Sequence, residues 1–87
     1  MFERCNDQVS VLASFGHKAS GQIVVTPHIM KWRSRRYHID TMGLHHLAKR
    51  GHKRMHVFGF SSGSNDFTLE LNPETLEWTL VEVYYGA

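Results

Sequence analysis

The residues best suited to a chemical task are the basic side chains that crowd segment 30–39. Arginine forms bidentate contacts with phosphate and lysine adds a point charge, so a dense group of both favours an anionic ligand. Residues 18–54 contain nine Lys or Arg and one acid, Asp40, for a net charge of +8. Residues 55–87 contain five acids and no Lys or Arg, for a net charge of −5. Such asymmetry indicates either an anionic partner or pairing between neighbouring strands.

A hairpin over residues 30–39, with Ser34 and Arg35 as its two-residue loop, places these side chains on two faces. Side chains alternate along a strand and lie opposite one another across a hairpin. The apolar face carries Met30, Trp32, Tyr37 and Ile39. The basic face carries Lys31, Arg33, Arg36 and His38, with Arg35 at the tip. Arg33 opposite Arg36 is a like-charge pair, which a bound anion would relieve.

We therefore expect a non-enzymatic module that binds DNA, RNA or another polyanion, because a phosphate backbone satisfies such a surface. The basic stretch 49–54 extends the surface if the segment before it folds over the same side. The predicted binding residues are Lys31, Arg33, Arg35, Arg36, His38, Lys49, Arg50, Lys53 and Arg54. The alternative is a solvated face, or one whose bases pair with Glu70, Glu77 and Glu82 of an adjacent strand.

A second hypothesis is a protein-interaction or homo-oligomerisation domain. In that case the basic hairpin meets an acidic protein surface, for example the face that Glu70 and Glu77 share in a second copy. Membrane binding is not expected, because the uncharged apolar runs are too short to span a bilayer.

Other chemistry finds less support in the sequence. The histidines nearest one another are His45, His46, His52 and His56, and imidazole binds zinc or copper. No cysteine pair or carboxylate completes a ligand set, so neither a metal nor another cofactor is predicted. The serines of the 61–64 loop lack a Gly-x-Ser-x-Gly elbow, and Cys5 lies near a terminus without an ordered base. Catalytic residues are therefore not expected.

The elements that must position the basic residues are short strands. Strands are predicted over 8–15, 22–26 (ended by Pro27) and 54–60. Segment 41–53 is expected to be a basic loop with at most one short helix near 43–50. A second hairpin joins 66–71 to 76–85 through a four-residue turn, so that Leu71 faces Leu76 and Glu70 faces Glu77. Six to seven antiparallel strands predict an all-β fold, either a small barrel or a two-sheet sandwich.

Eighty-seven residues make one domain, 1–87, in which residues 1–7 are expected to be frayed. The single cysteine fits a reducing compartment, and the first residues lack the apolar segment of a secretory signal. Cytoplasmic localisation is expected.

The hairpin sequence Met30-Lys31-Trp32-Arg33-Ser34-Arg35-Arg36-Tyr37-His38-Ile39 resembles the Trp-Arg-Gly-Arg-Arg-Tyr-x-Val signature of a small bacterial β domain. That domain also resembles the C-terminal end of mutasome-type homologues of Y-family DNA polymerases. The similarity runs from Pro27 to Ala87 and includes Trp78, with Ser34 standing where the family has glycine. The resemblance implies an accessory β domain and carries no functional assignment of its own.

Overall fold

The computed structural model describes residues 1–86, and it confirms the predicted all-β, antiparallel class. The strands are β1 (Phe2–His17), β2 (Ile23–Trp32), β3 (Arg35–His38), β4 (Thr41–Arg50), β5 (Lys53–Ser62), β6 (Asn65–Leu71) and β7 (Trp78–Tyr84). They form one sheet in the order β3-β2-β1-β7-β6-β5-β4. The described part of the chain contains no helix with the length and hydropathy that a membrane crossing needs.

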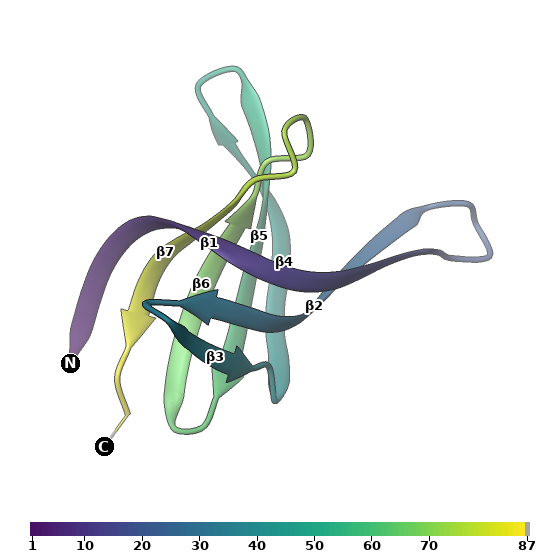
Figure 1. Ribbon diagram of the computed structural model, residues 1–87. Helices are drawn as coiled ribbons and strands as arrows, with labels where there is room; N and C mark the ends of the chain where they lie inside the picture. Colours follow the sequence, from purple (N-terminus) through teal and green to yellow (C-terminus); the bar gives the residue numbers. More distant parts are fainter. Residues whose placement is uncertain (87) are drawn as a thin grey trace.

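β1 belongs to both halves of this sheet, which curls into a half-barrel (Figure 1). Its first part pairs with β7 and its second part pairs with β2. At the opposite corner the chain passes from β3, at one edge, to β4, at the other. There the Ile39 N–H donates to the His28 carbonyl at 3.0 Å, and the Asp40 N–H donates to the Ser61 carbonyl at 2.9 Å. In Figure 1, β2 and β3 therefore run across the direction of β5 and β6.

The hydrophobic core lies between the two halves and comes mainly from β2, β5, β6 and β7. Its buried side chains are Met30, Trp32, Phe58, Phe60, Phe67, Leu69, Leu71, Trp78, Leu80 and Val83. Tyr37 of β3 links the halves, because its ring centroid lies 5.2 Å from that of Phe67 and 6.1 Å from that of Trp32. Aromatic pairs at such distances add to the free energy gained by burial.

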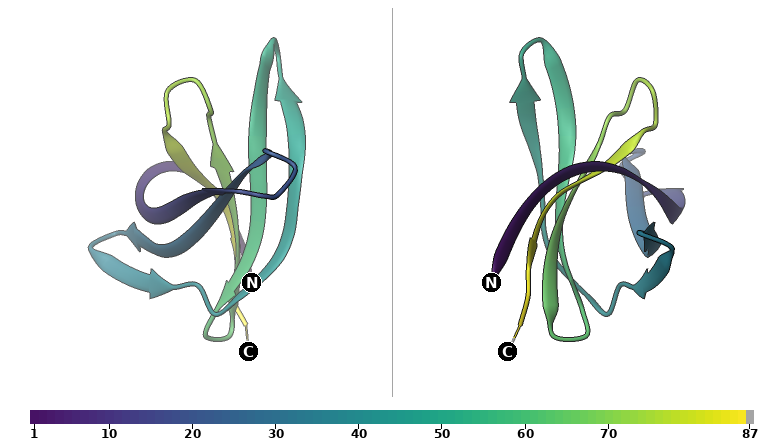
Figure 2. Two further views of the ribbon diagram at one scale, coloured as in Figure 1. Left: turned by 90° about the vertical axis from the view of Figure 1, so that its right-hand side faces the viewer. Right: turned by 60° about the vertical axis from the view of Figure 1, so that its left-hand side comes forward.

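Three connections project from the half-barrel and frame its open side. The β4–β5 hairpin, which ends at turn 51–52, and the β6–β7 loop of residues 72–77 both point to the top of Figure 1. The β1–β2 connection, residues 18–22, extends to the right in the same view, and Figure 2 shows the three projections from two further sides.

The basic hairpin keeps its predicted faces but has a different register. The loop is Arg33–Ser34, with φ of 50° and 62°, and not Ser34–Arg35. A two-residue shift of register preserves which side chains share a face, so the apolar face of Met30 and Trp32 is confirmed. The like-charge pair is consequently Lys31 opposite Arg36, whereas Arg33 lies in the turn.

Segment 41–53, predicted as a loop with at most a short helix, is instead β4 and the turn that follows it. β4 pairs with β5 along its whole length and forms an edge of the sheet. Both faces of β4 are exposed, including Leu44 and Leu47. Its sequence therefore lacks the apolar alternation that marks a half-buried strand. β2 also continues through Pro27, which lies opposite Ala13 next to a register shift in β1 and is tolerated there.

The second hairpin has a six-residue loop where four residues were predicted. Leu71 faces Trp78, and Leu76 is exposed in the loop with φ of 62°. Glu70 consequently faces Thr79, and Glu77 lies in the loop, so the predicted cross-strand pair of Glu70 with Glu77 does not form.

The start of the chain also differs from the expectation of fraying over residues 1–7. Phe2 lies opposite Tyr84, and the pairing of β1 with β7 extends from there to Val9 across a register shift after Arg4. Ladder pairing with the last strand holds this segment in the sheet.

Candidate nucleic-acid interface

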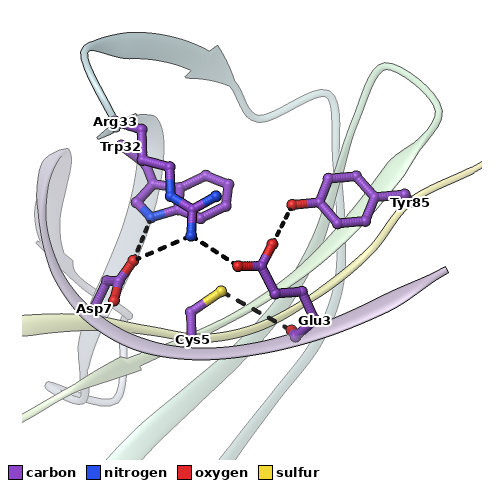
Figure 3. A network of polar contacts seen from close by, with 6 residues as sticks. All are labelled: Glu3, Cys5, Asp7, Trp32, Arg33 and Tyr85. Atoms are coloured by element: carbon purple, nitrogen blue, oxygen red, sulfur yellow. Dashed lines mark hydrogen bonds and ion pairs between the residues drawn. The ribbon is translucent and has the colours of Figure 1, made fainter.

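Arg33, a predicted binding residue, is occupied by contacts within the protein (Figure 3). Its guanidinium lies 4.2 Å from the centroid of the Trp32 ring, and its Nη2 donates to Glu3 Oε2 at 2.7 Å. The same nitrogen lies 4.0 Å from Asp7 Oδ2, which accepts a hydrogen bond from Trp32 Nε1 at 2.8 Å. The Tyr85 hydroxyl donates to the other oxygen of Glu3 at 2.5 Å. These contacts join the hairpin turn to β1 and to the residue after β7.

Hydrogen bonds in this network shift the pKa of its members. The Tyr85 hydroxyl, and then the Arg33 guanidinium, lower the pKa of Glu3 because both donate to its carboxylate. The same hydrogen bonds raise the pKa of Tyr85 and of Arg33. Burial raises the pKa of the Cys5 thiol, which disfavours the thiolate that a nucleophile would need. Arg33 is thus a cation matched by an internal anion.

The other basic residues of the β2–β3 hairpin lie on its two faces. Lys31 and Arg36 face each other and line a shallow hollow beside Leu12. Arg35 is on the opposite face, with its guanidinium 5.9 Å from the centroid of the Tyr37 ring. The last member of the group is exposed His38. We call Lys31, Arg35, Arg36 and His38 the hairpin surface.

The β4–β5 hairpin carries the second group of bases at its tip. Lys49 faces Arg54, and Arg50 faces Lys53. Arg50 forms an ion pair with Glu70, whose side chain is 8% exposed. We call the other three residues, Lys49, Lys53 and Arg54, the arm surface.

The hairpin surface and the arm surface lie at different ends of the molecule. All views place the tip of β4–β5 far from the turn of β2–β3 (Figures 1 and 2). The expectation that residues 49–54 extend the basic face of the first hairpin is therefore not met. The structure brings the predicted residues together as two separate groups, with Arg33 and Arg50 withdrawn into ion pairs.

Internal charge pairing accounts for few of the bases. Of the ten Lys and Arg residues, Arg33 and Arg50 are the two that form ion pairs within residues 1–86. Glu77, a predicted partner for the basic face, instead accepts a hydrogen bond from the Gln8 side chain at 3.0 Å. Most of the positive charge therefore faces solvent.

Two of the clustered histidines meet beside the core. The His45 ring stacks on Phe58 at 4.3 Å, and His45 Nε2 lies 3.0 Å from His56 Nδ1, a distance at which one ring donates to the other. Burial, followed by the nearby charges of His56, His46 and Lys18, lowers the pKa of His45. Within residues 1–86 no three potential ligands gather as a metal site would require.

Sequence reasoning missed an apolar groove of about 430 Å³ on the open side of the half-barrel. The groove is lined by Phe15, Val25, His56, Leu71, Pro73 and Leu76. Phe15 is 55% exposed and Leu76 is 60% exposed. One signal was available, since Phe15 continues the inward-facing series of Val11 and Ala13 beyond the end of the core.

No family model, curated protein or solved structure matches the chain.

A larger hollow, about 560 Å³, lies on the reverse side of the sheet and is a poorer candidate. Its lining includes Arg4 and Arg50 but also Glu70 and Glu82. An anionic ligand would meet both carboxylates there, so the hollow does not favour a polyanion.

Proposed function

We propose that the protein is a non-enzymatic module that binds a nucleic acid or a similar polyanion through the hairpin and arm surfaces. The supporting observation is the pairing of like charges across strands. The three pairs are Lys31 with Arg36, Lys49 with Arg54, and Arg50 with Lys53. Such pairs destabilise a sheet by a fraction of a kcal/mol, about 0.2–1 each. A phosphate between two paired cations removes that repulsion and replaces it with attraction.

The separation of the two surfaces favours a polymer over a small anion. A polymer can contact both surfaces at once, and the second contact is then intramolecular, which raises the overall affinity. Backbone recognition of this kind releases counterions, so affinity should fall steeply with salt.

Fluorescence anisotropy with labelled oligonucleotides, from low to physiological salt, tests the proposal. We expect the double variants Lys31→Gln/Arg36→Gln and Lys49→Gln/Arg54→Gln each to weaken binding and to reduce the salt slope by about 2, one unit for each lost phosphate contact. Near-ultraviolet circular dichroism of buried Trp32 and Trp78 checks that the variants fold. Absence of binding at low salt, or full affinity in both folded variants, would contradict the proposal.

A second candidate function is self-association through β4, which is favoured by the open edge of this strand. β4 is a ten-residue edge strand without a neighbour on its outer side among residues 1–86, and Met42, Leu44 and Leu47 are exposed along it. Open edges of this length template pairing with another strand. The version in which the basic hairpin meets Glu70 and Glu77 of a second copy loses support, because Glu70 already pairs with Arg50 and Glu77 accepts a hydrogen bond from Gln8.

Analytical ultracentrifugation at high protein concentration tests self-association. A dimer that Leu47→Lys disrupts would support pairing through β4, since Leu47 is exposed and its replacement leaves the core unchanged. A strict monomer at every concentration removes this candidate.

A further inference from the structure

We infer that the apolar groove receives unstacked bases of a single-stranded nucleic acid while the arm surface holds its phosphates. This inference rests on the proposed function and narrows the ligand class. It uses three features that meet on the open side of the half-barrel: an exposed aromatic ring, a leucine held in an unusual backbone conformation, and a row of cations.

The exposed ring belongs to Phe15, near the end of β1. Phe15 lies opposite Val25 of β2, and both side chains line the groove. Over half of Phe15 remains accessible, although it continues the face of β1 that packs in the core. An accessible ring beside a basic strand is the feature on which single-stranded nucleic acids stack their bases.

Leu76 forms the opposite wall of the groove, and its backbone is strained. Its φ of 62° lies in the left-handed region, which disfavours a branched side chain with no compensating contact. The loop imposes this conformation: the Leu76 N–H donates to the Asn72 carbonyl at 2.7 Å, while Asn72 Oδ1 accepts from the Glu74 N–H at 2.9 Å. Strain of this type concentrates at ligand-contacting positions. The Leu76 side chain therefore lies at the groove and not in the core.

Cations continue from the groove toward the tip of β4–β5. His56 lines the groove, and Arg54 precedes it by two residues on the same face of β5. Lys49 lies opposite Arg54, and Lys18 is near enough to His45 to lower the pKa of that imidazole. Phosphates can therefore follow the β4–β5 hairpin while bases enter the groove.

The charges around the groove also favour one path for the nucleic-acid backbone. Glu74 follows the lining residue Pro73 in the 72–77 loop. Because that carboxylate repels phosphate, the backbone should lie along the β4–β5 side. A duplex hides its base faces by stacking and cannot fill the groove in this way.

The test compares three labelled probes by anisotropy: a single-stranded oligonucleotide, the matching duplex, and heparin, a polyanion without bases. We expect Phe15→Ala to weaken binding of the single strand about tenfold and to leave heparin binding unchanged. Phe2→Ala is the matched control, because Phe2 is also exposed but packs edge-to-face against Tyr84 at the far end of β1. Phe15→Trp should retain affinity, and its fluorescence should be quenched when the single strand binds.

Each remaining outcome separates the inference from the proposed function. If none of the probes binds at low salt, both fail. If all three bind and Phe15→Ala changes none of them, the polyanion function stands and the groove inference is overturned. Equal weakening of all three probes by Phe15→Ala, in a variant that circular dichroism shows to be folded, also overturns it. If an apolar peptide changes the Phe15→Trp fluorescence and the single strand does not, the groove belongs to a different ligand and the inference is overturned.

Discussion

The guanidinium of Arg33 covers the ring of Trp32, with the central carbon 4.2 Å from the ring centroid. The two residues are consecutive, and the positive φ of Arg33 at the turn directs its side chain back over its neighbour. Both also bond to acids of β1, through Glu3 and Asp7 (Figure 3). Arg33 therefore links the β2–β3 turn to β1 and stabilises the fold.

Arg33 and Arg36 should behave differently when neutralised. Arg33→Asn should lower the thermal unfolding midpoint and leave the salt slope of polyanion binding unchanged, since asparagine tolerates positive φ but cannot bond to Glu3. Arg36→Gln should reduce the salt slope by about 1 and leave stability the same or slightly higher, because repulsion from Lys31 is relieved. An equal loss of slope in both variants would show that Arg33 is free to bind the ligand.

Arg50 should be the one arm-tip base whose loss destabilises the protein. Arg50→Gln leaves the carboxylate of Glu70 buried without its cation, and we expect the free energy of unfolding to fall by about 1–3 kcal/mol. Addition of Glu70→Gln should recover most of this loss in urea unfolding. Lys53→Gln is the control on the facing strand and should not destabilise. Additive effects of the Arg50 and Glu70 substitutions would contradict the pairing.

Leu76→Gly should change stability and binding in opposite directions. Glycine adopts a φ of 62° without steric cost, so we expect the free energy of unfolding to rise by about 0.5–1 kcal/mol. The same substitution removes one wall of the groove and should weaken single-strand binding severalfold. Leu44→Ala, at an exposed site outside the groove, should change neither measurement. A loss of stability in Leu76→Gly would mean that the leucine contributes packing that outweighs its strain.

His45 should make stability fall on acidification. Burial, with His56, His46 and Lys18 nearby, lowers its pKa in the folded protein, so below pH 6.5 the unfolded chain takes up a proton that the folded protein resists. The free energy of unfolding should therefore decrease as pH falls through this range and then level off below the folded pKa. His45→Phe keeps a ring stacked on Phe58 and should flatten the profile between about pH 7.5 and about pH 5. His52→Phe, in the exposed turn, is the control; if it flattens the profile equally, His45 is not responsible.

The sequence predicted faces more reliably than registers. Alternation determines which side chains lie together, and Met30, Trp32 and Tyr37 do line one side of the first hairpin. The two-residue shift was invisible because it preserves every face. Its cause is a turn with positive φ at Arg33 and Ser34. Glycine or asparagine would have predicted this conformation, whereas arginine and serine do not.

β4 and the candidate site depend on tertiary structure that local patterns do not contain. An edge strand exposed on both faces needs no apolar alternation, so the sequence of β4 indicated a loop with at most a short helix. The two basic groups separate because the β2–β3 turn and the β4–β5 tip extend in different directions from the corner at residues 39–40. The groove forms between Phe15 and Leu76, which lie far apart in the chain, so it could be seen only once the sheet had curled.

The pairing of β1 with both β2 and β7 also has a kinetic consequence. Residues 10–17 of β1 pair with a strand that follows at once, whereas Phe2 must find Tyr84 almost at the other end of the chain. Closing so long a loop is slow, because its entropy must be lost before the contacts form. During synthesis the first half of β1 must wait, unpaired, until β7 has left the ribosome. β7 therefore completes the pairing of β1, and the half-barrel cannot close before β7 has been made.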